Sequence, residues 1–223
     1  TVNKENIQGY HMGDGVTFLY QSNKEYENIF PFWDWKKLPG TTLIQHKDTL
    51  PYLTAWGYHI KSDFVGGVSD GENGIAVLDY NRDGLKAHKS WFMFENEIVA
   101  LGAGINQSNG DSPVVTTINQ SKRDTPIKYK ILTTEADLQG TQPVISSSFK
   151  WLFHNSVGYY NLIENQQFEF SQSSNSGYDL FNIGINHGIN PTNEKYAYII
   201  KPDINISQVN NNPSQYIQIL KNT

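Results

Sequence analysis

The chain has 223 residues, a formal net charge of −5 and no cysteine, and 38% of its residues are hydrophobic, 13% aromatic and 17% charged. The low charge and plentiful aromatic residues exclude a disordered tail and a coiled coil, and the length allows a domain with a real core. The missing cysteines exclude disulfide frameworks, thiolate zinc sites and cysteine nucleophiles.

The chain opens at Thr1 without an initiator methionine or a secretory leader, which indicates a mature or excised segment. No apolar run approaches the roughly 18 residues needed to cross a bilayer, so we expect no membrane partner.

The first predicted element is a hairpin. It joins Ile7–Met12 to Val16–Tyr20 through Gly13-Asp14-Gly15, because Asp-Gly supplies the positive φ that tight hairpin turns need. A helical turn is then predicted at Asp34–Leu38. Pro39-Gly40-Thr41-Thr42 is interpreted as a tight turn and Gly66-Gly67 as a close backbone approach.

Short β-branched and aromatic runs bounded by turn residues continue through the rest of the chain, whereas helical periodicity is rare. The nearly continuous apolar run Lys89–Phe94 is typical of a strand covered on both faces, and Trp91 and Trp151 are predicted to be buried. The predicted strands are Gly74–Tyr80, Leu85–Phe94, Ile98–Gly102, Val114–Ile118, Ile127–Thr133, Lys150–His154, Ser156–Leu162, Gln167–Phe170, Tyr178–Asn186 and Tyr196–Lys201.

So many strands without helices between them predict an all-β fold, a large antiparallel β-sandwich. A second helical turn is predicted at Glu135–Leu138, and exposed loops at Gln172–Gly177 and Asn210–Gln215. We expect residues 1–202 to form one domain and residues 203–223 to form a terminal strand and linker.

Catalytic and metal-binding signatures are scarce. The six histidines form no HxxxH pair, and a site from His11, His59 and a carboxylate is allowed by spacing alone. Among the acids, the set Asp70, Asp79, Glu95 and Glu97 allows a glycosidase pair, against the simpler interpretation that these residues are solvated at turns. We expect no metal and no cofactor.

Two arginines on an acidic chain argue against a nucleic-acid partner. Thirteen tyrosines, eleven phenylalanines and five tryptophans are a more informative surplus, because sugars bind with their apolar faces on aromatic rings. Trp56, near a loop-to-strand junction, is either such a ring or part of the core.

Several segments in order resemble the polysaccharide lyases that cleave hyaluronan, chondroitin and xanthan by elimination. They are Asn3-Lys4-Glu5-Asn6 with Gly9, Gly13-Asp14-Gly15, Trp33-Asp34-Trp35, Leu38-Pro39-Gly40-Thr41-Thr42, Phe64-Val65-Gly66-Gly67-Val68-Ser69-Asp70-Gly71, Lys86-Ala87-His88-Lys89-Ser90-Trp91-Phe92, Glu97–Ile105, Thr116-Thr117-Ile118-Asn119-Gln120 and Tyr196-Ala197-Tyr198-Ile199.

The resemblance implies a secreted modular enzyme with an N-terminal helical toroid, a central β-sandwich and a smaller C-terminal β-domain. This chain is similar to the central sandwich alone. The family's catalytic residues lie in the toroid, so none is expected here, and the toroid of the same protein is an expected partner. The implied substrate is a glycosaminoglycan, hyaluronan or chondroitin.

The reaction removes the C5 proton of a uronic acid, which requires a neutralised carboxylate, a base, and an acid for the departing oxygen. The resemblance places two substrate-binding residues in this chain, Asn3 and Trp56, the latter stacking on sugar. The glutamate that the family carries three residues before this asparagine would fall before Thr1, which puts a supporting catalytic role in doubt. The alternative is an autonomous carbohydrate-binding or scaffolding sandwich that is never an enzyme.

Overall fold

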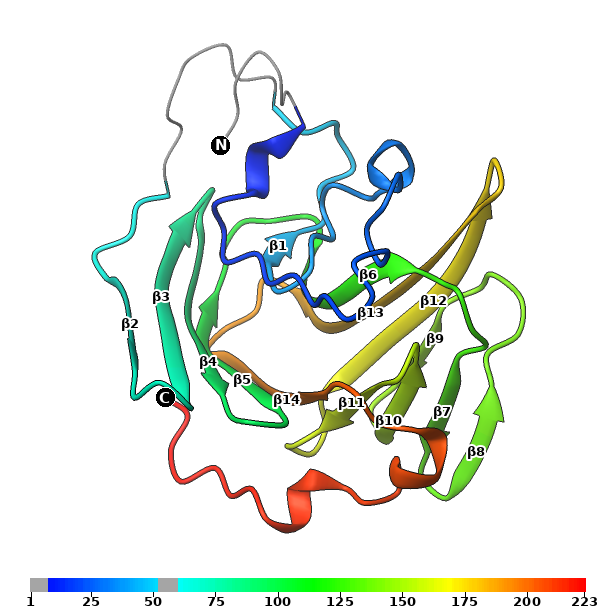
Figure 1. Ribbon diagram of the computed structural model, residues 1–223. Helices are drawn as coiled ribbons and strands as arrows, with labels where there is room; N and C mark the ends of the chain where they lie inside the picture. Colours follow the sequence, from blue (N-terminus) through cyan, green and yellow to red (C-terminus); the bar gives the residue numbers. More distant parts are fainter. Residues whose placement is uncertain (1–7, 52–59) are drawn as a thin grey trace.

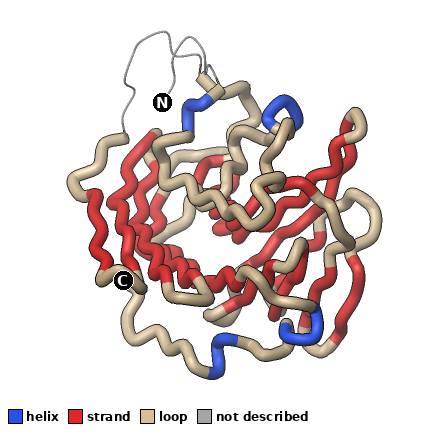
Figure 2. The backbone as a smooth tube through the Cα atoms, viewed as in Figure 1, coloured by secondary structure: helices blue, strands red, loops and turns tan. Residues whose placement is uncertain are grey.

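The computed structural model describes residues 8–51 and 60–223, which form two antiparallel β-sheets packed face to face. Figure 1 shows the longer sheet curving around the shorter one, and Figure 2 shows that helix in the described part of the chain is confined to short turns. The all-β antiparallel sandwich predicted from the sequence is confirmed. No helix among the described residues is long and apolar enough to span a membrane.

The shorter sheet has the strand order β1-β6-β13-β12-β9. Its strands are β1 (Thr42–Ile44), β6 (Pro113–Lys122), β9 (Val144–Ser146), β12 (Gln167–Asn175) and β13 (Tyr178–Ile189). The longer sheet has the order β2-β3-β4-β5-β14-β11-β10-β7-β8. Its strands are β2 (Val65–Ser69), β3 (Gly74–Arg82), β4 (Leu85–Met93), β5 (Ile98–Asn106), β7 (Lys128–Ile131), β8 (Thr134–Asp137), β10 (Phe149–His154), β11 (Val157–Asn161) and β14 (Glu194–Lys201).

The main core lies between the two sheets. Large side chains from alternate positions of the long sheet, such as Tyr80, Trp91 and Tyr198, meet Phe168 and Phe181 of the short sheet in one buried cluster. Burial of these rings is the principal source of stability, because the hydrophobic effect scales with the apolar area removed from water. Trp91 and Trp151 are both buried, as predicted.

The outer face of the short sheet is also covered, which explains why the central residues of β6 are buried on both faces. Residues 12–38 cross it without forming a strand, and Tyr26, Trp33 and Leu38 pack there against Leu180. The hairpin predicted for residues 7–20 is therefore wrong in its described part. A single turn of 3-10 helix, η1 (Gly9–His11), replaces its first arm. The Asp14 side chain is buried in the protein interior instead of lying at the tip of an exposed hairpin turn.

Two other local predictions are also wrong. Residues 135–138 lie mostly in strand β8 rather than in a helical turn, and residues 172–175 extend β12 into a long hairpin with β13 rather than forming a loop. Neither segment shows hydrophobic alternation, so cross-strand pairing decides their conformation. The short segment Phe30–Phe32 forms 3-10 helix η2.

Residues 203–223 form no strand. They run along the outer face of the long sheet and contain two 3-10 turns, η3 (Ile206–Gln208) and η4 (Pro213–Gln215), whose N-caps are Asn205 and Asn212. Ile204 and Val209 pack there on Trp151 and Tyr160. Asparagine caps and Pro213 favour helix starts over a strand, which explains the difference from the sequence-based expectation.

Candidate functional site

The turn between β3 and β4 gathers two segments that are far apart in the sequence. The backbone carbonyl of Asn81 accepts a hydrogen bond of 2.9 Å from the backbone N–H of Lys61. The next residue, Arg82, donates from Nη1 to the backbone carbonyl of Tyr10 over 2.8 Å. Tyr10 and Lys61, which are far apart in the sequence, therefore meet at the same end of the sandwich.

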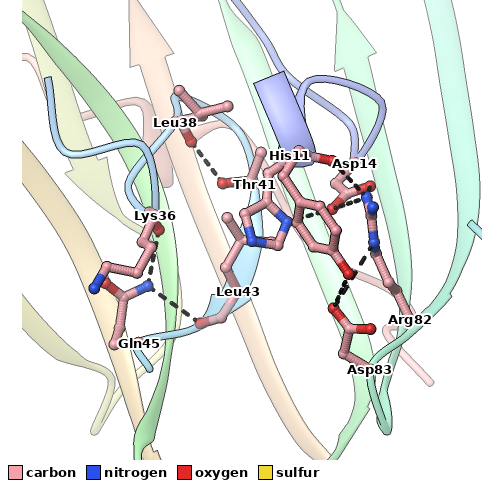
Figure 3. A network of polar contacts seen from close by, with 10 residues as sticks. His11, Asp14, Lys36, Leu38, Thr41, Leu43, Gln45, Arg82 and Asp83 are labelled. Atoms are coloured by element: carbon pink, nitrogen blue, oxygen red, sulfur yellow. Dashed lines mark hydrogen bonds and ion pairs between the residues drawn. The ribbon is translucent and has the colours of Figure 1, made fainter. Parts of the chain in front are cut away.

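A buried network of charged groups braces this end (Figure 3). Asp14, which is fully buried, accepts hydrogen bonds from Arg82 Nη1 at 2.7 and 3.0 Å. His11 Nδ1 lies 2.7 Å from the same carboxylate, and Tyr10 donates its hydroxyl to Asp83 over 2.9 Å. The guanidinium also covers the Tyr10 ring at 3.8 Å. The contacts tie η1 to the β3–β4 turn through both charge and packing.

The electrostatics of the network favour the ionised pair. Burial by itself lowers the pKa of Arg82, but the Asp14 carboxylate and the hydrogen bonds to Asp14 and Tyr10 together outweigh that effect and hold the pKa above its usual value. Removing either partner of such a pair leaves an uncompensated buried charge. The pair therefore anchors η1 to the end of β3.

A second cation, Lys89 of β4, points into the sandwich and is 2% exposed. Its Nζ donates to the backbone carbonyl of Gly40 over 2.5 Å and lies 5.2 Å from the Trp91 ring centre. Burial lowers the pKa of Lys89 to about 7, against a smaller opposite effect of Asp14. Lys89 thus connects the long sheet to the turn that precedes β1.

That turn and Gly67 of β2 have the backbone roles interpreted from the sequence, whereas a Cβ on Gly66 would meet only the Phe64 ring, at 3.4 Å. Gly40 has φ +82°, and a Cβ there would lie 2.4 Å from Oγ1 of Thr17. The Thr41 hydroxyl donates to the Leu38 carbonyl over 2.7 Å and closes the turn. A Cβ on Gly67 would lie 2.8 Å from the Ile75 carbonyl oxygen, which is the expected close approach.

The two predicted substrate-binding residues, Asn3 and Trp56, lie outside the described residues, as does His59. His11, the other half of the metal hypothesis, is engaged with Asp14. Within residues 8–51 and 60–223, no group of three or more His, Asp or Glu side chains is placed to hold a metal ion.

The four candidate carboxylates have separate surroundings. Asp70 accepts hydrogen bonds from the backbone N–H groups of Asn73 and Glu72, which lower its pKa. Asp79, in the middle of β3, lies 3.5 Å from His88. Glu97 lies in the turn between β4 and β5, where Lys201 and Tyr216 contact it. Glu95 lies in the turn after β4 and is exposed. The contacts of the first three support the interpretation that they are solvated or locally paired.

Asp14, Arg82 and Lys89 are the residues that sequence reasoning missed. Asp14 was assigned to a turn and Lys89 to an ordinary strand position. One signal was available for Lys89: strand alternation places it on the same face as Ala87 and Trp91, and that face is buried.

An antiparallel double sheet whose buried charges brace one end defines an all-β sandwich domain. The sequence model of polysaccharide lyase family 8, super-sandwich domain, matches residues 1–213. The chain belongs to this family, as the resemblance indicated.

Individual relatives support the same family assignment. The chain is 38% identical to chondroitinase-AC of Pedobacter heparinus over 226 residues, covering 91% of this chain and 31% of the relative. It is 28% identical to hyaluronate lyase HylB of Enterococcus faecalis, covering 99% of this chain and 25% of the relative. The chain thus spans less than a third of the length of these relatives.

Solved structures give the same result. A chondroitinase AC lyase structure superposes with a TM-score of 0.86 at 33% identity, covering 98% of this chain and 34% of that one. A xanthan lyase from Paenibacillus superposes with a TM-score of 0.78 at 26% identity, covering 97% of this chain and 23% of that one.

Proposed function

We propose that this chain is the central β-domain of a secreted polysaccharide lyase that degrades hyaluronan or chondroitin by β-elimination at the uronic acid. The domain forms one wall of the substrate cleft, and catalysis resides in a helical toroid of the same protein. The observation that carries the proposal is the match of residues 1–213 to the super-sandwich domain of a lyase family. Residues 1–202 constitute this domain, and residues 203–223 lead toward a further β-domain.

Within this function, Asn3 hydrogen-bonds the substrate and Trp56 stacks on a sugar ring. Support comes from the flanking residues, since Tyr10 and Lys61 are both hydrogen-bonded to the β3–β4 turn. The buried pair of Asp14 and Arg82 keeps this end rigid. Rigid support of contact residues is what a cleft wall contributes to catalysis.

The test is an elimination assay that follows absorbance of the unsaturated uronide. We expect no activity from the 223 residues alone and activity when the toroid is part of the same protein. Activity of the isolated chain would overturn the assignment of catalysis to the toroid. If the protein with its toroid is also inactive on hyaluronan and chondroitin but the chain binds sugar, the alternative of an autonomous carbohydrate-binding sandwich is favoured instead.

The role of Trp56 is tested by Trp56→Ala in the same protein. Loss of one ring stacked on sugar should raise KM roughly tenfold, by analogy with aromatic pairs. Phe94→Ala is the matched control, because Phe94 is 45% exposed and follows β4 at the end opposite the β3–β4 turn. Equal kinetics for the two variants would remove Trp56 from the site.

A further inference from the structure

A pocket of about 620 Å³ opens where β13 gives way to β14. It is lined by three segments, residues 163–167 between β11 and β12, residues 185–188 at the end of β13, and residues 193–195 at the start of β14. Pockets that take small ligands usually measure roughly 300–1,000 Å³. The volume therefore suits one or two sugar rings.

The walls are rich in side chains that both donate and accept hydrogen bonds. Asn165, Gln167 and Asn193 contribute exposed amides, and Ile163 adds an apolar surface. Amides match sugar hydroxyls, which also donate and accept. The remaining wall is held in place, because Asn186 donates to Glu169 over 3.0 Å and accepts from the backbone N–H of Gly188 over 2.8 Å.

His187 supplies a further polar group to the lining of this pocket. Its Nε2 is hydrogen-bonded to Oγ1 of Thr116 at 2.8 Å, and its ring lies against Tyr196. The other ring nitrogen, Nδ1, can then serve a ligand. Burial, aided by the Lys89 cation, lowers the pKa of His187 to about 3. The imidazole is therefore neutral at pH 7 and offers a hydrogen bond without a charge.

The charges that line the pocket disfavour an anion. Glu164 and Glu194 contribute two carboxylates, whereas Lys195 contributes one cation. A uronate would have to approach a lining whose charged side chains sum to −1, and His187 could not form an ion pair with it.

We propose that this pocket is a binding site for a neutral sugar unit, held by the amides of Asn165, Gln167 and Asn193 and by His187. The inference goes beyond the proposed function, because it uses none of the residues assigned there and needs no elimination activity.

The test is an NMR titration of the 223-residue chain with two neutral trisaccharides, chitotriose and maltotriose, and with an acidic hyaluronan tetrasaccharide. We expect a neutral trisaccharide to shift the amide signals of residues 163–167, 185–188 and 193–195 and the Nδ1 signal of His187. The double variant Gln167→Ala/Asn193→Gly should weaken binding about 30-fold, since each of the two lost hydrogen bonds contributes roughly 1 kcal/mol.

The matched control is Gln142→Ala/Asn109→Gly. Both residues are exposed and lie outside the pocket, and Asn109 shares with Asn193 a positive φ that glycine tolerates. An unchanged Kd in this control with a weakened Kd in the pocket variant supports the proposal. The proposal is overturned if neither neutral sugar shifts these signals, if only the acidic fragment does, or if both variants bind equally well.

Discussion

Replacing Lys89 by methionine removes a cation from between the two sheets while keeping a long apolar stem. Lys89 is 2% exposed, and its charge is satisfied mainly by the Gly40 carbonyl at 2.5 Å. Because burial lowers its pKa from 10.5 to about 7, the unfolded chain binds more protons at this position than the folded chain does between those pH values. Stability must then rise with pH across this window.

The size of the effect follows from the two pKa values. Between about pH 7 and pH 9.5 the deprotonation of buried Lys89 should increase the unfolding free energy by about 3 kcal/mol. The measurements stop below pH 10, because tyrosines begin to ionise there in the unfolded chain. Burial raises the pKa of Tyr159 and Tyr198, so these two residues stay protonated in the folded chain, and stability then falls as the pH rises. Lys89→Met should lack this gain.

The assay is urea unfolding, followed by tryptophan fluorescence, at four pH values across the window. The difference in unfolding free energy between the wild-type chain and Lys89→Met should change by about 3 kcal/mol. Lys150→Met, at an exposed position of β10, should parallel the wild-type chain. Parallel pH profiles for the wild-type chain and Lys89→Met would refute the argument that Lys89 is buried with a depressed pKa.

Other replacements test the packing and the buried pair. Gly102→Ala should destabilise the chain by about 3 kcal/mol or more in thermal or urea unfolding, because its Cβ would lie 2.0 Å from the Tyr196 ring. Gly110→Ala is the control, since its Cβ would meet only the flexible end of a glutamine, and a similar loss there would contradict the steric explanation. Arg82→Met should cost about 3–5 kcal/mol by leaving Asp14 buried without its guanidinium, and a cost under 1 kcal/mol would show that the pair does not anchor η1.

Local pattern predicted most strands of this sandwich correctly. The predicted strands Gly74–Tyr80 and Leu85–Phe94 correspond to β3 and β4, which pair as a hairpin. The run Lys89–Phe94 was expected to be covered on both faces, but its residues alternate between buried and more exposed positions. Alternation works here because one face of each strand meets a core, so side-chain type repeats every second residue. It failed at residues 135–138 and 172–175, where polar strands are held by their neighbours.

The candidate site depends on contacts between distant residues, which local sequence patterns do not predict. Resemblance pointed to Asn3 and Trp56, but no spacing in the chain indicates that Tyr10 and Lys61 converge on one turn. Asp14 and Arg82 are separated by 68 positions, and either residue alone is typical of a surface turn. Their pairing depends on where the β3–β4 turn lies in the folded sandwich.

The fold class, most strands and the family could thus be inferred without a structure, because periodicity and ordered motifs are properties of neighbouring residues. Only the tertiary structure decided that Asp14 and Lys89 are buried, that residues 12–38 cover the short sheet, and that His187 ends in a polar pocket. The physical reason is that the burial of a charge is set by the segments that surround it, and the topology of the sheets brings those segments together from distant parts of the chain.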